Sequence, residues 1–154
     1  YLCMDRIDLA EKAEQEMAKM DDMATLSQIA SAQVCLAKGD SGSIKTALSI
    51  YTELQEKFGD SVSLLNSLAL CHMVRANYSE SEKLLVAAVR QQANSAETLV
   101  NLLVCAHHKK NSSTLINKYI NRLKSLAPEN VWVDKYCKLE SSFDSLSKRY
   151  APSV

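Results

Sequence analysis

The sequence predicts an all-α protein, a right-handed α-solenoid of antiparallel helix pairs with a C-terminal capping helix. Its composition is poor in the residues that turns and strands need, with only three glycines and two prolines in 154 residues. The run LLNSLALC at 64–71 recurs in similar form as TLVNLLVC at 98–105. A period of about 34 residues is typical of helix–turn–helix units, which stack because one unit alone cannot bury its apolar face. We therefore expect a single solenoid domain over residues 1–154.

Residues 62–95 form the most regular unit, and they match the tetratricopeptide repeat. In that repeat, small residues let two helices approach closely and larger apolar residues fill the remaining gaps. The small positions hold Ala69, Ser81 and Ala88, and the larger ones hold Leu65, Leu68, Tyr78 and Leu85. We expect helices over 62–75 and 79–92, with Asn77 or Ser79 capping the second helix.

Residues 96–129 predict a degenerate copy of the same unit. Asn94 and Glu97 have the spacing of a capping box ahead of the apolar run, so a helix should begin there and end near His108. A second helix should follow residues 111–113 and stop before Pro128. Leu115 and Arg122 stand where small residues are expected, which loosens the helix crossing.

Residues 23–61 predict the preceding unit. Its inward residues are expected to be Leu26, Ile29 and Ala30 in the first helix, and Ala47, Tyr51 and Leu54 in the second. Leu26 lies further from its expected counterpart Leu65 than one repeat period allows. We assign the excess to a loop over Lys38–Ser43, KGDSGS, because its glycines and small polar residues favour a turn.

The two ends of the chain predict incomplete elements. Residues 1–22 should be a truncated repeat, with one helix over 6–20 and Ala10, Ala13 and Met17 pointing inward. The chain opens without Met inside a helical pattern, so we expect a fragment of a longer protein. Residues 130–150 should form the capping helix. Its apolar stripe consists of Trp132, Tyr136, Leu139, Phe143 and Leu146. A free partner-binding helix or a helix on a membrane surface would have the same stripe, so both remain alternatives to the capping role.

The sequence contains no motif that predicts catalysis. It has no glycine-rich phosphate loop, no HExxH, no CxxC and no GxSxG, so we expect no enzyme, no cofactor and no metal site. The pairs Cys71-His72 and Cys105…His107-His108 fit no common zinc spacing. Lys plus Arg and Asp plus Glu both total 18, and the basic cluster around Lys109–Lys124 contains a single aromatic residue, so nucleic acid is not an expected partner.

The five cysteines predict unpaired thiols. They follow one another at similar long intervals, one in each unit, which is poor spacing for local disulfides. We expect reduced, buried thiols in a cytosolic protein.

The first helices of the two best units are apolar almost all round, which indicates burial on every side. In a bare solenoid one of those sides would face water, so we expect a bound protein segment along the inner face. The residues expected at that contact are Leu70, Met73, Val74, Val100 and Val104. Tight curvature or self-association would cover the same face. Because these inner positions carry no Lys, a clamp for acidic tails is not expected.

Four short runs resemble the coatomer epsilon subunit family. They are NSLALCHM at 66–73, ETLVNL at 97–102, DMATLSQIA at 22–30, and the ending FD at 143–144 with YAPS at 150–153. Each run is short, but all four occur in the family's order, between residues 22 and 153. The chain therefore resembles the C-terminal half of that family.

The resemblance implies a non-enzymatic subunit of the coat on vesicles that move from the Golgi to the endoplasmic reticulum and within the Golgi. It implies an open superhelix that binds the C-terminal domain of the coatomer alpha subunit and meets other coat subunits indirectly. It also implies a cytoplasmic location, with association to Golgi and vesicle membranes only through the coat. A general tetratricopeptide adaptor, or a self-associating repeat protein with another partner, remains the alternative.

Overall fold

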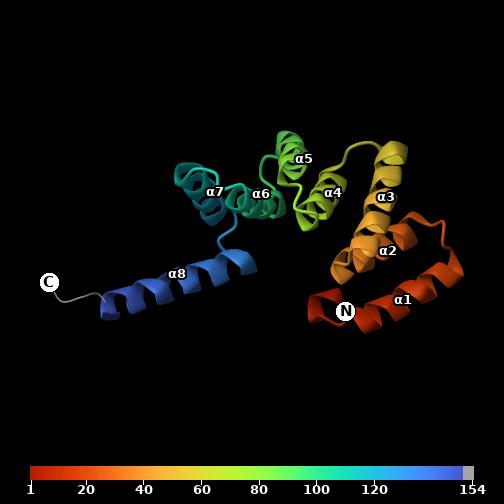
Figure 1. Ribbon diagram of the computed structural model, residues 1–154, viewed down its shortest axis with the longest axis horizontal. Coiled ribbons are helices and arrows are strands. Elements are labelled where there is room, and N and C mark those ends of the chain that lie inside the picture. The colour runs from red at the N-terminus through yellow and green to blue at the C-terminus, as the bar shows by residue number, and fades with distance from the viewer. Residues whose placement is uncertain (151–154) are drawn as a thin grey trace. The chain divides into compact units, whose positions relative to one another are not determined.

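The computed structural model describes residues 1–150, and the last four residues, which include most of the family-like YAPS ending, lie outside them (Figure 1). Residues 1–150 contain helices and no strand, so the predicted all-α class is confirmed. The helices are α1 (Ile7–Met20), α2 (Thr25–Lys38), α3 (Ser41–Phe58), α4 (Val62–Val74), α5 (Tyr78–Gln91), α6 (Ala96–His108), α7 (Ser113–Leu126) and α8 (Val131–Tyr150), preceded by the short 3-10 helix η1 (Leu2–Met4).

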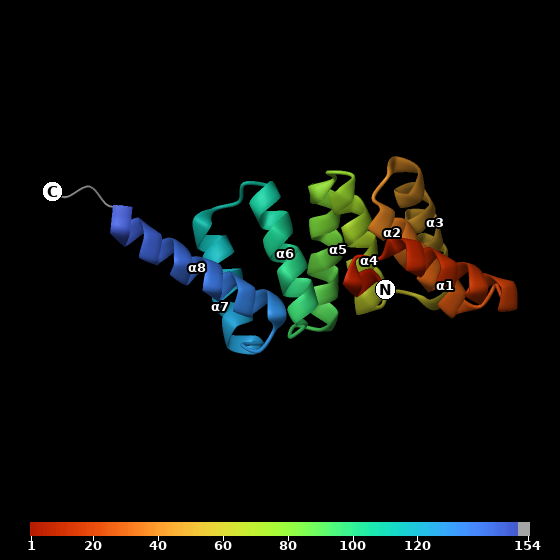
Figure 2. The same ribbon diagram turned by 90° about the horizontal axis from the view of Figure 1, so that it is seen from below.

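The chain divides into two compact units, Tyr1–Ala93 and Asn94–Val154. In the first unit, each helix from α1 to α5 packs against the next, and in the second α6 packs against α7 (Figure 2). Short connections between packed neighbours give the helix pairs that the repeat period predicts. α4, α5, α6 and α7 begin and end close to the expected positions, and serine side chains cap α4, α6 and α7. The predicted Asn94–Glu97 capping box is wrong, because the N-cap of α6 is Ser95. Asn77 is the N-cap of α5, but its side chain makes no capping hydrogen bond.

The core of the first unit lies between α2, α3 and α4. Its small members, Ala32 and Ala47, are fully buried and let the helices approach closely, as the repeat pattern predicts for such positions. The larger members are Ile44, Tyr51, Leu54, Leu68 and Cys71. In the second unit, Leu99, Leu123 and Val133 bring α6, α7 and α8 together.

The predicted Lys38–Ser43 loop is wrong. The connection consists only of Gly39 and Asp40, and Ser41–Ser43 already belong to α3. The Asp40 carboxylate accepts hydrogen bonds from the backbone N–H groups of Gly42 and Ser43, both at 3.0 Å, so the small polar residues form a capped first turn. The extra length lies in α3, which has 18 residues where α5 has 14.

The sequence pattern also predicts wrongly that Leu26 points inward, because its side chain is 73% exposed. α2 begins at Thr25, α4 at Val62 and α6 at Ala96, so the first interval is longer than the second. When the starts of α2 and α4 are aligned, Ala32 and Ala69 fall at the same position in their helices, and both are fully buried.

Met17 likewise lies at the surface of α1, although Ala10 is buried as expected. Met17 borders a shallow hollow that it shares with Leu2 of η1 and with Ala10, Ala13, Ala30 and Val34. Ala10 is the buried residue of α1.

The capping role predicted for residues 130–150 holds only for the start of α8. Val133 is buried against α6 and α7, and Trp132 and Cys137 pack partly there. From Lys138 to Tyr150 every residue is exposed, including Leu139, Phe143 and Leu146 of the predicted stripe. Amphipathic spacing predicts that a helix has an apolar face, but it does not specify what covers that face.

Candidate partner-binding site

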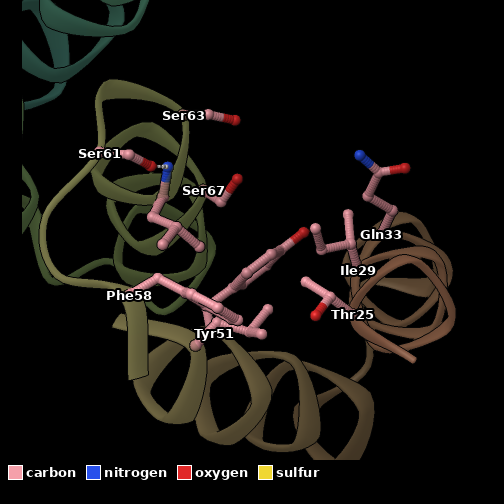
Figure 3. A pocket seen from close by; sticks show the side chains of 10 residues that line it. Thr25, Ile29, Gln33, Tyr51, Phe58, Ser61, Ser63 and Ser67 are labelled. Atoms are coloured by element: carbon pink, nitrogen blue, oxygen red, sulfur yellow. Dashed lines mark hydrogen bonds between the residues drawn. The ribbon is translucent and has the colours of Figure 1, made fainter. Parts of the chain in front are cut away.

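An apolar hollow in the first unit lies between α2 and α4, above α3 (Figure 3). α2 contributes Thr25, Ile29 and Gln33, which follow one another at every fourth position and therefore share one face of the helix. Tyr51, Leu54 and Phe58 from α3, and Ser61, Ser63, Leu64 and Ser67 from α4 and its cap, complete the lining. α2 and α4 are the first helices of successive pairs, which are the helices predicted to form the inner face.

Tyr51 fixes the floor of this hollow. Its ring is almost fully buried. Burial raises the pKa of the Tyr51 phenol, so the group is neutral at physiological pH. The Ser61 hydroxyl accepts a hydrogen bond from the Leu64 N–H at 3.2 Å and anchors the start of α4 beside the hollow. Phe58, by contrast, is exposed at the rim.

The chemistry of the lining suits an uncharged apolar group. None of the ten lining side chains is charged at neutral pH, and the polar ones offer only hydroxyl and amide groups. The hollow measures about 180 Å³, and an engineered apolar cavity of about 150 Å³ is large enough to bind benzene. A leucine or aromatic side chain of a partner would therefore fit, while the serines and Gln33 could bond its backbone.

The inner-face residues predicted on α4 lie on its last two turns. Leu70 and Met73 are half-buried, and Val74 is 52% exposed. None of the three lines the α2–α4 hollow. Val74 instead borders a more polar hollow, shared with Gly39, Ser41, Ile44 and Arg75, where α3 begins.

The two residues predicted on α6 differ from each other. Val100 is half-buried and packs against the core of Leu99, Leu123 and Val133. Val104, one turn later, is 36% exposed at the surface of α6. A charge at Val100 would therefore disturb folding. A charge at Val104 would leave the core intact and would test whether the surface of α6 takes part in binding.

Sequence reasoning misses most of the α2–α4 hollow. Spacing assigns Ile29 and Tyr51 only to the core and gives no role to Thr25 and Gln33. Three helices must come together before these residues share a surface, and no local spacing specifies that. The sequence does contain one signal that could have found this surface. Ala32 and Ala69 are small residues at equivalent positions of α2 and α4, and aligning them gives the correct register between the two helices.

The thiols have the environment of packing groups. Burial raises the pKa of the Cys71 thiol to about 11 and also raises that of Cys35, so both stay protonated at neutral pH. Cys71 and Cys105 are buried as predicted, but Cys3 is exposed, and Cys35 and Cys137 are partly exposed. Within residues 1–150, no group of three or more His, Cys, Asp or Glu side chains is arranged to hold a metal.

Residues 1–150 also lack a helix of the length and hydrophobicity that crossing a bilayer requires.

Comparison with known proteins identifies the family. The family model described as coatomer epsilon subunit matches residues 1–151. The chain belongs to the coatomer epsilon subunit family. It is 37% identical over 151 residues to coatomer subunit epsilon-1 of Arabidopsis thaliana, a match that covers 98% of this chain and 50% of the relative.

Relatives from other organisms give the same result. The chain is 31% identical over 151 residues to coatomer subunit epsilon of Dictyostelium discoideum, covering 97% of this chain and 50% of the relative. It is 31% identical over 144 residues to coatomer subunit epsilon of Caenorhabditis elegans, covering 94% and 49% respectively. The resemblance inferred from the four short runs is thereby confirmed. The chain spans about half the length of these relatives.

Proposed function

We propose that this chain is a non-enzymatic scaffold segment of the coatomer vesicle coat and that it binds the C-terminal domain of the coatomer alpha subunit. Its role would then be in retrograde transport from the Golgi to the endoplasmic reticulum and within the Golgi, on the cytoplasmic side of those membranes. Other coat subunits would be met indirectly. The observation that carries the proposal is membership of the coatomer epsilon subunit family over residues 1–151.

The surface chemistry supports a protein partner that presents uncharged apolar groups. The hollow between α2 and α4 has an apolar floor at Tyr51 and Leu54 and a rim of hydroxyl and amide groups. The half-buried Leu70 and Met73 and the exposed Val74 continue apolar surface along α4. Val100 and Val104 provide a second apolar strip on α6. A general adaptor role with a different partner is the competing proposal, and the same experiment distinguishes the two.

The test is co-expression with the C-terminal domain of a coatomer alpha subunit, followed by size-exclusion chromatography with light scattering. We expect a stable one-to-one complex. Val74→Asp and Val104→Asp should each weaken it about tenfold or more, because an uncompensated carboxylate would be buried at the contact.

The matched control is Val86→Asp. Val86 is 37% exposed, almost the same as Val104 at 36%, but lies on α5, the second helix of its pair. It should leave binding unchanged, and circular dichroism should show native helix content for all three variants. Two separate peaks for the folded wild-type chain and the alpha domain would contradict the proposed partner. Equal weakening by Val86→Asp would contradict the assigned surface.

A further inference from the structure

The second half of α8 carries an apolar stripe that the chain itself leaves uncovered. α8 runs on past α6 and α7 in both views (Figures 1 and 2). Leu139 is 71% exposed and Phe143 is 70% exposed, and Leu146 and Tyr150 are exposed as well. The exposed segment from Lys138 to Tyr150 is about 20 Å long at 1.5 Å per residue. An apolar stripe of this length is unusual on a surface that stays in water.

The stripe has the spacing of a coiled-coil seam. Its apolar residues alternate at intervals of four and three, so two heptad positions, called d and a, recur at every seventh position. The d positions are Trp132, Leu139 and Leu146, and the a positions are Tyr136, Phe143 and Tyr150. Trp132 and Tyr136 stack at 5.3 Å between ring centroids and stiffen the base of the seam.

We propose that α8 pairs with α8 of a second copy of this chain in a parallel, in-register, two-stranded coiled coil. Charges beside the seam specify this partner and this direction. Lys135 is at a g position, and Glu140 is at the following e position. In a parallel pair, the g position of one helix faces the next e position of the other. Lys135 of each copy therefore faces Glu140 of the other copy, which gives two ion pairs, one on each side of the seam.

The opposite direction is disfavoured by the same charges. In an antiparallel pair that covers the same stripe, g positions face g positions, which places Lys135 against Arg149 of the second copy. Two such repulsive pairs would form and none of the Lys135–Glu140 pairs. In the parallel arrangement Lys135 faces Glu140 of the second copy, and these charges are opposite. The next facing g and e positions hold Ser142 and Ser147, which are neutral, so they add no repulsion.

The intrachain contacts of α8 leave room for this pairing. Val133 and Cys137, at e and b, and Trp132, at the first d position, pack toward α6 and α7. The Lys124 ammonium of α7 also lies 5.2 Å from the centroid of the Tyr136 ring. These helices therefore cover part of the base of the seam and leave it open from Leu139 onward. A two-fold axis along the coiled coil then places α6 and α7 of the two copies on opposite sides of the helix pair. The Lys124 ammonium bonds Oε2 of Glu140 at 2.7 Å, which leaves Oε1 available to Lys135 of the second copy. Because the seam is short, the dimer should be weak and reversible.

Sedimentation equilibrium of the whole chain over a wide concentration range tests the proposal. The average mass should rise from 17.1 kDa toward twice that value. Phe143→Asp should weaken the dimer at least tenfold by placing two carboxylates in the seam. The matched control Ser145→Asp, at an exposed position away from the seam, should not change it.

Charge reversal tests the direction. Lys135→Glu should weaken a parallel dimer about tenfold, and mixing it with a Glu140→Lys chain should restore pairing, since both cross-pairs become attractive again. An antiparallel dimer would instead be strengthened by Lys135→Glu, which would overturn the proposal. So would a chain that stays monomeric at every concentration, assemblies larger than a dimer, or a dimer unaffected by Phe143→Asp.

Discussion

His72 shows how a single residue links burial to pH. Its ring is partly buried on α4, and its Nδ1 atom is buried without a hydrogen-bond partner. Burial lowers the pKa of this imidazole, Glu80 partly opposes the effect, and Arg75 adds to it. The folded protein therefore binds a proton at His72 less readily than the unfolded chain, whose histidines titrate near pH 6.5.

The consequence is a loss of stability on the acid side of neutrality. A lowered histidine pKa means that the unfolded state binds more protons, so the free energy of unfolding falls as pH drops through about 6.5 and below. His72→Gln removes the titrating group, so we expect the variant to lose less stability between pH 7.5 and 5.5 than the wild type. Urea unfolding midpoints at several pH values measure this. Parallel pH profiles for the two proteins would show that His72 is not responsible.

The exposed and buried thiols show how far residue-level prediction reaches. Cys71 and Cys105 recur at one apolar position of the repeat, and both are buried, since a period fixes which face a side chain occupies. Cys3 precedes the first full helix, where no periodicity applies, and it is exposed. Spacing therefore predicts burial inside the regular repeats and fails outside them.

At the level of elements, the turns between paired helices repeat as faithfully as the helices. Ala76 after α4 and Lys110 after α6 occupy the same position in successive repeats, and both adopt left-handed backbone, with φ of 58° and 54°. In each turn the next residue donates a hydrogen bond back into the helix: Asn77 N–H to the His72 carbonyl at 2.8 Å, and Asn111 N–H to the Ala106 carbonyl at 3.0 Å. This pattern is a common helix ending, usually built on glycine.

Glycine at these two positions should therefore stabilise the protein. Left-handed backbone costs a residue with a Cβ about 1–2 kcal/mol, and the greater freedom of glycine in the unfolded chain offsets part of that gain. We expect Ala76→Gly and Lys110→Gly each to raise the free energy of unfolding by about 0.5–1 kcal/mol, or the melting temperature by about 2–4 °C per kcal/mol. Calorimetry measures this. Ala87→Gly, inside α5, is the control and should destabilise.

Local signals predict the helices well but misjudge two connections between elements. Helix bounds follow from apolar spacing and from the caps Ser61, Ser95 and Ser112, each of whose hydroxyls accepts a hydrogen bond from a backbone N–H in the first turn. The Lys38–Ser43 segment has the composition of a loop, yet the Asp40 side chain caps it into helix. Spacing identifies the stripe of α8 correctly, but whether the chain covers it depends on the direction in which α8 leaves α7. Composition and spacing carry no information about that direction.

At the scale of the molecule, each unit has its own core. Leu54, Ile44 and Tyr51 hold α2, α3 and α4 together in residues 1–93, and Leu99, Leu123 and Val133 hold α6, α7 and α8 in the second unit. Repeat proteins derive stability from each unit and from its contacts with nearest neighbours. Stability should accordingly be lost unit by unit when one core is weakened.

Leu123→Ala tests this independence. Leu123 is almost fully buried, and removing its side chain should cost about 2–5 kcal/mol. Because Leu123 contacts the core of α6 and α8, hydrogen exchange should accelerate throughout residues 94–150, while amides of α2 and α3 keep their protection. Leu54→Ala should produce the reverse pattern, with acceleration in α2, α3 and α4. If either variant accelerated exchange evenly along residues 1–150, the two cores would have to unfold as one cooperative unit, and nearest-neighbour additivity would not describe this chain.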